Sequence, residues 1–502
     1  MLKKIRVIAA VLCLVLLTLL FLDFTGTLHH WFGWLAKVQL VPAILAINVV
    51  AIVVLVVLTL LFGRIYCSVI CPLGVMQDGI SNVSGRRKKK KNRFRYSKPK
   101  TWLRFLVLGM FVAALIIGVS VIASLLDPYA AYGRMASNFL APLYGLGNNL
   151  LSWIAERADS YAFYPTDVWI KSGITFGIAV VTLIVVGILA WRGGRTYCNT
   201  ICPVGTFLGF ISRFSIFRPA FDTDKCTKCG LCERGCKASC IDSKNMTIDQ
   251  SRCVTCFNCL DKCKFGGIKY TTRRSSALKT ESMPKDSSVG EKGGVSRRDF
   301  LAITGALVLT NTLKAQQLQM DGGLADIEDK KIPDRQSPVV PPGAQGQRNM
   351  KQHCTACQLC VSACPNGILR PSAKLSTLMQ PEMSFERGYC RPECTECSQV
   401  CPTGAIGRIT PADKTGLSIG QAVWIKDNCV VNTDELQCTS CERHCPTGAI
   451  TLIPIDPESR QSLKLPVIDK TLCIGCGACE YYCPARPFSA IYVEGNVMHH
   501  TV

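Results

Sequence analysis

Residues 62–74 read FGRIYCSVICPLG, and residues 192–205 read RGGRTYCNTICPVG. Each copy follows an apolar stretch and contains the pattern Y-C-x3-C-P-x-G, so the first part of the chain is an internal repeat. Cysteines four positions apart lie on one face of a helix, and each copy therefore presents two sulfur atoms side by side. The repeat predicts two equivalent halves whose cysteine motifs meet in the folded chain.

The repeat lies in an apolar part of the sequence. The 502 residues are 48% apolar with a mean hydropathy of +0.24, which is too hydrophobic for an ordinary soluble protein. Four stretches are long enough to cross a bilayer. They run over about residues 5–22, 38–62, 102–126 and 171–191. We therefore expect an α-helical bundle of four transmembrane helices within residues 1–220, with a retained anchor rather than a cleaved signal peptide at its start.

A fifth segment, from Ser137 to Ala155, is better explained as an interfacial, amphipathic external loop. An odd number of crossings between the two cysteine motifs would place them on opposite faces of the membrane. Pro142, Asn148 and Asn149 also suit a loop better than a span. Four spans therefore remain the prediction.

Charge indicates which side of the membrane the loops occupy. The chain has 57 Lys and Arg against 35 Asp and Glu, a formal charge of +22, and ten of the basic residues lie between Arg86 and Lys100. A short basic segment between apolar runs is typical of a cytoplasmic loop. Basic residues also precede the first span and follow the fourth, on the same predicted side. The excess positive charge thus needs no nucleic-acid partner.

The cysteines indicate metal clusters rather than disulfides, because 24 of the 30 fall into six regularly spaced groups of four. Two groups with the spacing C-x2-C-x2-C-x3-C lie within residues 221–270. In two-cluster ferredoxins, three close cysteines bind one [4Fe-4S] cluster and the fourth binds the other. The expected ligand sets are Cys226, Cys229, Cys232 with Cys263, and Cys253, Cys256, Cys259 with Cys236. Zinc is the competing metal.

The two groups within residues 221–270, which we expect on the cytoplasmic side, depart from the usual pattern in two places. Lys237 and Lys264 follow the fourth cysteines, where proline usually stands. Cys240 is an extra thiol, interpreted as packing beside the cluster or as an alternative ligand.

Four more groups lie in residues 349–502, which predicts a domain with four [4Fe-4S] clusters. The outer groups are regular and the inner two are irregular in spacing. They comprise Cys354, Cys357, Cys360, Cys364; Cys390, Cys394, Cys397, Cys401; Cys429, Cys438, Cys441, Cys445; and Cys473, Cys476, Cys479, Cys483. Either adjacent groups exchange their fourth cysteines, or outer pairs with outer and inner with inner. Like spacing favours the nested arrangement. His353 and His444 are expected to pack or form hydrogen bonds beside the ligands.

The two cysteine-rich parts are separated by linkers over residues 271–295 and 316–348. Between them, residues 296–315 begin with SRRDFL and continue into a mildly apolar run, a pattern that resembles a twin-arginine signal. That route exports folded proteins, and it suits a domain whose clusters are assembled in the cytosol. We therefore expect a fifth membrane segment here and an exported domain after it.

The four cysteines of the repeat are candidate additional metal ligands: Cys67, Cys71, Cys198 and Cys202. Four thiolates select iron or a [2Fe-2S] cluster. The alternative is that all four are small packing residues, as Cys13 is expected to be. The spacing alone leaves both open.

With these motifs assembled, the chain resembles a fusion of two accessory proteins of periplasmic nitrate respiration. Residues 1 to about 270 are similar to NapH-type membrane quinol dehydrogenases and NosR-type proteins, through the duplicated C-x3-C-P and the paired ferredoxin motifs. Residues from about 296 onward are similar to NapG/MauM-type exported ferredoxins, through SRRDFL and the four cysteine groups. The resemblance implies small α+β ferredoxin-like domains on a helical bundle in the bacterial cytoplasmic membrane.

It also implies a function: oxidation of menaquinol or ubiquinol and delivery of electrons to a periplasmic reductase or cytochrome. The chain has no nucleotide loop and no acid–base constellation, so we expect an electron-transfer subunit rather than a stand-alone enzyme. The quinol site is the least defined part. His29, His30, Asp127 and Tyr129 are candidates, and interfacial anchoring is the competing role. A maturation factor or redox sensor for a periplasmic metalloenzyme is the alternative function.

Overall fold

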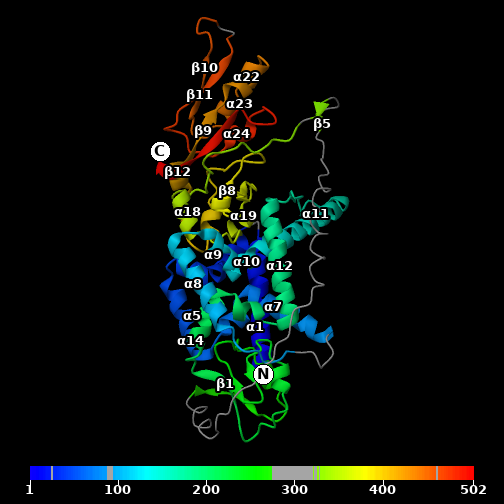
Figure 1. Cartoon of the computed structure of the whole chain (residues 1–502). Helices are drawn as coiled ribbons and strands as arrows, with labels where there is room; N and C mark the ends of the chain where they lie inside the picture. Colours follow the sequence, from blue (N-terminus) through cyan, green and yellow to red (C-terminus); the bar gives the residue numbers. More distant parts are fainter. Residues whose placement is uncertain (24–25, 88–93, 274–319, 322–324, 327, 460–461) are drawn as a thin grey trace, which may run out of the picture.

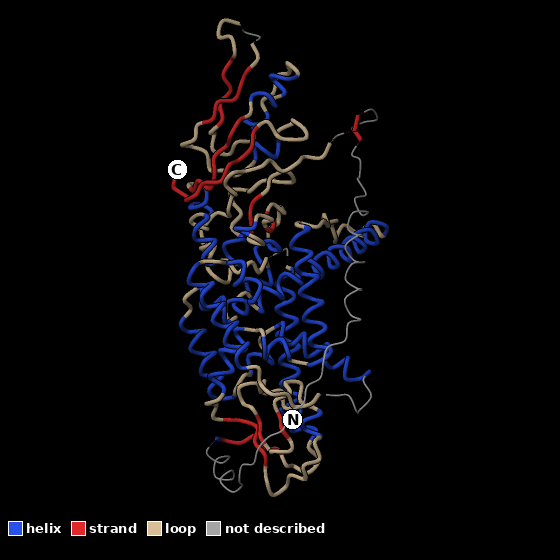
Figure 2. Tube along the Cα trace, viewed as in Figure 1, coloured by secondary structure: helices blue, strands red, loops and turns tan. Residues whose placement is uncertain are grey.

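The computed structural model describes the chain except residues 24–25, 88–93, 274–319, 322–324, 327 and 460–461. Its described part is elongated, with helices in the middle and a cysteine-rich domain at each end (Figure 1). Strands lie at these two ends and in the short β5–β6 pair beside the molecule (Figure 2). The predicted twin-arginine segment, residues 296–315, lies outside the described residues.

The central bundle is built from helices of very different length. They are α1 (Leu2–Leu22), α2 (Thr27–Phe32), α3 (Trp34–Lys37), α4 (Leu40–Leu45), α5 (Val49–Phe62), α6 (Ile65–Val69), α7 (Pro72–Arg87), α8 (Thr101–Ile117), α9 (Ser120–Leu126), α10 (Pro128–Met135), the π-helix η2 (Ala136–Leu140), α11 (Ala141–Arg157), α12 (Gly173–Gly193), α13 (Thr196–Thr200) and α14 (Pro203–Ser212). Among the described residues, α1 and α12 are the two helices long and apolar enough to cross a membrane. Both coincide with predicted spans.

The other two predicted spans are interrupted, so the prediction of continuous helices over 38–62 and 102–126 is wrong. The first breaks between α4 and α5, where Ile47 has a φ of 52° and the Asn48 side chain accepts a hydrogen bond from the Ala51 amide. The second breaks at Gly118, whose φ of 83° is unfavourable for other residues. The apolar helices that remain are α5 with 14 residues and α8 with 17.

The segment Ser137 to Ala155, predicted as an interfacial, amphipathic external loop, is helical. It continues from α10 through η2 into α11, which leaves the bundle at a slant (Figure 1). Apolar residues recur along α11, and Leu143, Leu150 and Trp153 are exposed. In contrast, every residue of α10 is buried. The structure therefore places α10 inside the molecule, between the bundle and the C-terminal domain.

The cysteine-rich domain beside the chain's N-terminus is closed by a two-stranded antiparallel sheet. Its elements are β1 (Phe217–Phe221), α15 (Leu231–Arg234), β2 (Ile241–Asp242), β3 (Thr247–Ile248), α16 (Asn258–Lys262) and β4 (Ile268–Thr272). Phe217 pairs with Thr272 and Phe221 with Ile268. The folded unit therefore extends slightly beyond the predicted 221–270, because both closing strands belong to it.

The C-terminal domain consists of short helices and two-stranded antiparallel sheets. Its elements are α18 (Gln347–His353), α19 (Leu359–Ala363), β7 (Leu369–Pro371), the 3-10 helix η3 (Leu375–Thr377), β8 (Pro381–Met383), α20 (Glu396–Val400), α21 (Pro411–Thr415), β9 (Leu417–Trp424), the 3-10 helix η4 (Lys426–Asn428), α22 (Val430–Thr433), α23 (Ser440–Arg443), β10 (Ile450–Pro454), β11 (Lys464–Ile468), α24 (Ala478–Tyr482) and β12 (Ile491–Thr501), preceded by β5 (Met320–Asp321) and β6 (Ala325–Asp326). The pairs are β5–β6, β7–β8, β9–β12 and β10–β11. Helix α19 packs on α20, and α23 packs on α24.

Candidate metal centres

Two cysteine-lined cavities lie in the domain of residues 217–272. One is lined by Cys226, Cys229, Cys232 and Cys263. The other, called the inner cavity here, is lined by Cys236, Cys253, Cys256 and Cys259 and also by the extra Cys240. In each cavity three cysteines come from one motif and the fourth from the other. This arrangement fits the ligand exchange expected of a two-cluster ferredoxin. The ligand roles themselves stay a prediction.

The regular motifs share one backbone geometry. In each, the residue before the second cysteine and the residue after it have positive φ. These residues are Lys228 and Gly230, Thr255 and Phe257, Ala356 and Gln358, and Gly475 and Gly477. Left-handed residues in such loops turn successive N–H groups toward one side, where they favour an anionic group such as an iron-sulfur cluster. In the irregular groups, Thr395 and Thr439 follow the corresponding cysteines with φ near −120°.

Lys237 explains one departure from the usual proline. Its Nζ lies 3.3 Å from Asp78 Oδ2 of the bundle, and its carbonyl accepts a hydrogen bond of 2.9 Å from the Arg195 amide. The lysine therefore attaches the domain to α7 and α13. Cys240 is buried, lies with its Sγ 3.5 Å from Cys236 Sγ and lines the same cavity as the expected ligands.

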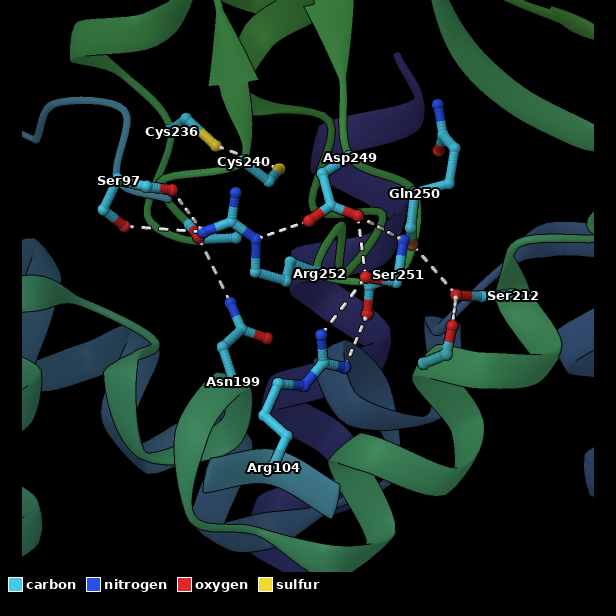
Figure 3. Close-up of polar contacts among 12 residues, drawn as sticks. Ser97, Arg104, Asn199, Ser212, Cys236, Cys240, Asp249, Gln250, Ser251 and Arg252 are labelled. Atoms are coloured by element: carbon cyan, nitrogen blue, oxygen red, sulfur yellow. Dashed lines mark hydrogen bonds and ion pairs between the residues drawn. The ribbon is translucent and has the colours of Figure 1, made fainter. Parts of the chain in front are cut away.

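The loop before Cys253 is held against the bundle by several hydrogen bonds (Figure 3). Arg104 donates from Nη1 to Ser251 Oγ and from Nη2 to Ser251 O, both at 3.2 Å. Ser212 Oγ donates to Gln250 O at 2.9 Å. Within the loop, Arg252 Nε donates to Asp249 Oδ2 at 2.6 Å. The inner cavity is thus fixed in position relative to α8 and α14.

In the C-terminal domain, adjacent groups pair, so the expectation of a nested arrangement is wrong. Burial raises the pKa of the Cys360 thiol, and the charge of Cys401 from the next group raises it further. Burial likewise raises the pKa of Cys397, and Cys364 from the preceding group adds to this. Packing of α19 on α20 determines this pairing, whereas the irregular spacing changes only the loops between cysteines.

The last two groups pair in the same way. Burial raises the pKa of Cys441 to about 12, and Cys438 and Cys483 contribute to the rise. Burial also raises the pKa of Cys476 to about 12, with a contribution from Cys445. Here the helices in contact are α23 and α24.

The sets follow one another outward from the bundle. A Cβ on Gly133 of α10 would lie 2.4 Å from the Cys357 carbonyl oxygen, so only glycine permits this approach. Farther out, the Cys390 amide donates to the Cys476 carbonyl at 2.9 Å, which links the first pair of groups to the second.

The histidines beside these groups have structural partners. His353 Nδ1 lies 3.2 Å from Asn349 O, and His444 Nδ1 lies 2.8 Å from Ser440 O. The His444 ring also stacks on Tyr482 with a centroid separation of 3.7 Å. This agrees with the predicted packing and hydrogen-bonding roles.

The C-x3-C-P cysteines gather where the two halves of the repeat meet. All four are 4–5% exposed. Burial raises the pKa of the Cys202 thiol, and the charges of Cys198, Cys71 and Cys67 raise it further, so the four thiols are neighbours. They do not share one helical face within each copy, because α6 and α13 end before the second cysteine and Pro72 and Pro203 begin new helices.

Two arginines that the sequence interpretation missed complete this site. Arg64 Nη2 donates to the Cys198 carbonyl at 3.2 Å and lies 3.7 Å from Cys67 Sγ. Arg195 Nη1 donates to the Cys67 carbonyl at 2.7 Å and lies 3.7 Å from Cys198 Sγ. Each arginine therefore crosses to the other half of the repeat. The signal was present, since both copies read R-x-Y-C.

The final glycine of each motif makes room for these arginines. A Cβ on Gly74 would lie 2.6 Å from Arg195 Nη1, and a Cβ on Gly205 would lie 2.7 Å from Arg64 Nη2. Asp78 Oδ1 accepts from Arg195 Nε at 2.7 Å, and Asp78 also pairs with Arg6. The motif R-x-Y-C-x3-C-P-x-G is thus one structural unit used twice.

The candidate quinol residues lie near the end of the bundle that meets the C-terminal domain. Asp127 and Tyr129 are fully buried, and the Asp127 side chain caps α10 by accepting from the Tyr129 and Ala130 amides. Burial raises the pKa of Asp127 to about 6. His29 Nδ1 lies 3.1 Å from Asp23 Oδ2. These contacts give Asp127 and His29 structural roles in the described chain.

Comparison with known proteins agrees with the cysteine geometry. A family model described as a 4Fe-4S binding domain matches residues 45–91 and 173–222, which hold the C-x3-C-P motifs. A model described as a 4Fe-4S dicluster domain matches residues 353–405, which hold the first two groups, and residues 436–486, which hold the last two groups except Cys429. The chain contains ferredoxin-type 4Fe-4S domains.

Three relatives are similar over parts of the chain. An uncharacterized protein of Methanocaldococcus jannaschii is 36% identical over 100 residues, 20% of this chain and 39% of the relative. The methylamine utilization ferredoxin-type protein MauM of Methylobacillus flagellatus is 36% identical over 149 residues, 28% of this chain and 62% of the relative. The ferredoxin-type protein NapF of Escherichia coli is 29% identical over 159 residues, which are 32% of this chain and 87% of the relative. The chain spans less than two thirds of the first two. The chain is thus similar over these parts to the ferredoxin-type proteins MauM and NapF.

Proposed function

We propose that the protein is anchored in the bacterial cytoplasmic membrane, oxidises menaquinol or ubiquinol, and passes electrons to a periplasmic reductase of the nitrate-reductase type or to a cytochrome. In this proposal, residues 1–270 correspond to a NapH/NosR-type unit and residues from 296 onward to a NapG/MauM-type unit. The two units are joined in one chain through a twin-arginine segment.

The outward-facing side chains of the bundle support the membrane location. Ile8 and Val11 of α1, Val50 of α5, Ile116 of α8 and Val181 of α12 are all more than half exposed. Apolar surface spread over several neighbouring helices is unfavourable in water and favourable in lipid. The proposed membrane unit is residues 1–220, with a cytoplasmic ferredoxin domain at 221–270 and an exported domain at 349–502.

The single observation that carries the electron-transfer part is the grouping of cysteines from different motifs. Six [4Fe-4S] clusters are proposed, and their chemistry is one-electron exchange with neighbouring centres. The proposed ligand sets are Cys226, Cys229, Cys232 with Cys263; Cys253, Cys256, Cys259 with Cys236; Cys354, Cys357, Cys360 with Cys401; Cys390, Cys394, Cys397 with Cys364; Cys429, Cys438, Cys441 with Cys483; and Cys473, Cys476, Cys479 with Cys445. The C-x3-C-P cysteines are proposed to hold a further iron centre.

The test uses the full chain purified anaerobically in detergent. We expect EPR signals of [4Fe-4S] clusters after chemical reduction, and partial bleaching of the visible absorption when a water-soluble quinol analogue is added. Cys229→Ser should alter one signal, whereas Cys13→Ser on α1 should alter none. A colourless, iron-free chain would refute the cluster assignment. Clusters that a quinol analogue leaves oxidised would refute quinol oxidation and favour a maturation role.

A further inference from the structure

The two cysteine-rich domains lie at opposite ends of the helical bundle (Figure 1). We propose that the iron centre of Cys67, Cys71, Cys198 and Cys202 is an iron-sulfur cluster that relays electrons between the two ends, its negative charge balanced by the crossed Arg64 and Arg195. The inference rests on the proposed function in taking the cysteine sets at both ends as cluster ligands.

The burial of Arg64 and Arg195 is the first reason to place a negatively charged cluster at the four cysteines. Both side chains are fully buried, and Arg64 Nε and Arg195 Nη2 are buried without a hydrogen-bond partner. Removing a guanidinium from water is costly unless negative charge compensates it. The hydrogen-bond acceptors of Arg64 are Asn199 Oδ1 and the Ser251 and Cys198 carbonyls, and none carries a charge.

Arg195 has a carboxylate partner, Asp78, but other cations share that carboxylate. Asp78 pairs with Arg6, Arg195 and Lys237, so one negative charge faces three positive charges. Four neutral thiols beside this arrangement leave an excess of buried positive charge. A cluster with four thiolate ligands supplies the missing negative charge.

The sulfur atoms also have donors suited to thiolates. Gln77 Nε2 lies 3.3 Å from Cys198 Sγ, and the Gly205 amide donates to Cys202 Sγ at 3.3 Å. The guanidinium of Arg64 lies 3.7 Å from Cys67 Sγ. Hydrogen bonds to ligand sulfur are among the factors that set the reduction potential of an iron-sulfur cluster.

A polynuclear cluster fits this geometry better than a single ion. No three His, Cys, Asp or Glu side chains in the described part of the chain converge as ligands of one ion. The cysteine groups matched by the 4Fe-4S dicluster model also lack such a single-ion arrangement. A single ion needs all its sulfur ligands within about 2.3 Å, whereas a cluster separates them by its own width.

On one side, the site contacts the loop that precedes Cys253. Arg64 Nη1 donates to Ser251 O at 3.1 Å while Nη2 of the same guanidinium faces Cys67 Sγ. A Cβ on Gly63 would lie 2.9 Å from the Oγ1 atom of Thr255, a residue that stands between Cys253 and Cys256 in the sequence. One residue pair, Gly63 and Arg64, therefore joins the four-cysteine site to the inner cavity of the domain at residues 217–272.

On the other side, α7 and α10 connect the site to the C-terminal domain. Helix α7 begins directly after Cys71 and packs on α10. A Cβ on Gly133 of α10 would lie 2.4 Å from the Cys357 carbonyl oxygen. The site thus has a packed connection to each end.

The relay step is simple electron exchange. A reduced centre at one end loses one electron and is oxidised, and the four-cysteine centre gains that electron and is reduced. The four-cysteine centre then passes the electron to the centre at the other end and returns to its oxidised state. No bond forms or breaks and no proton is required. The final donor and acceptor are the quinol and the exported acceptor of the proposed function.

The test uses the full chain with oxidised clusters in sealed phospholipid vesicles, and titanium(III) citrate as a reductant that the bilayer excludes. If the relay operates, clusters at both ends bleach before detergent is added, whichever way the protein is inserted. The double variant Cys67→Ser, Cys198→Ser should bleach only in the part exposed to the reductant. It should also contain less iron and sulfide by one cluster, while Cys13→Ser should behave as the wild type.

Two results would overturn the inference. One is wild-type bleaching that stops at a fraction until detergent opens the vesicles, a result that needs no variant to fold. The other is a double variant with wild-type iron content and complete bleaching. Either would leave the six-cluster proposal intact, because that proposal fails only if the detergent-purified chain lacks [4Fe-4S] signals.

Discussion

Replacing Arg64 by glutamine should make the reduction potential of the four-cysteine centre more negative. Reduction adds negative charge to the centre, and a fully buried cation 3.7 Å from the Cys67 sulfur favours that charge. At an effective dielectric constant of about 20, one unit charge at this separation contributes about 4 kcal/mol. Because the added electron spreads over the whole cluster, we take about half, or about 2 kcal/mol, which corresponds to roughly 80 mV for one electron.

Arg64→Lys is the matched control, since it keeps the charge but loses the planar fork that reaches Asn199 and Ser251. Its potential should lie much closer to the wild type than that of Arg64→Gln. The assay is an EPR-monitored redox titration of the anaerobically purified chain, with the iron content of each variant measured in parallel. A glutamine variant that retains its cluster and titrates within about 20 mV of the wild type, a quarter of the shift estimated above, would refute charge balance by Arg64.

Three further predictions concern the surroundings of the sites. Asp78→Asn should lower the free energy of unfolding by about 3 kcal/mol in denaturant titrations, because the buried Arg6 and Arg195 and the partly buried Lys237 lose their shared carboxylate. Burial opposes ionisation of Asp78 but Arg195 and the other cations hold its pKa at about 2, so its stabilising contribution is present above the ordinary value near 3.8 and lost as the pH falls toward 2. Gly74→Ala should reduce iron content, because the added Cβ would lie 2.4 Å from the Cys67 carbonyl oxygen and 2.6 Å from Arg195 Nη1, whereas Gly79→Ala on the same helix, with nothing within 4 Å of the added Cβ, should not. Cys240→Ala should keep the wild-type iron content, and loss of one cluster would identify Cys240 as a ligand.

Much of the arrangement of cysteines could be predicted because it is local. The exchange of Cys236 and Cys263 follows from spacing, since three close cysteines leave the fourth for the neighbouring cavity. The pairing in the C-terminal domain could not be predicted, because it depends on α19 packing against α20 rather than on similarity of spacing.

The prediction for the helical part was correct for α1 and α12, and it was wrong in treating the other two apolar stretches as continuous helices. Hydropathy identifies apolar stretches, but it does not register the left-handed turn at Gly118 or the cap formed by Asn48. The role of Arg64 was also missed, because its partners lie about 130 positions away in the other half of the repeat, as its bond to the Cys198 carbonyl shows.

The crossed arginines have a consequence for the origin of the chain. Each half of the repeat lacks a cation at its own cysteine carbonyl and receives it from the other half. Two copies of a single half, related by a twofold axis, would supply each other in the same way, which is the property of an isologous dimer. An ancestral homodimer could therefore have formed this centre before gene duplication joined its subunits, and neither half alone would complete it today.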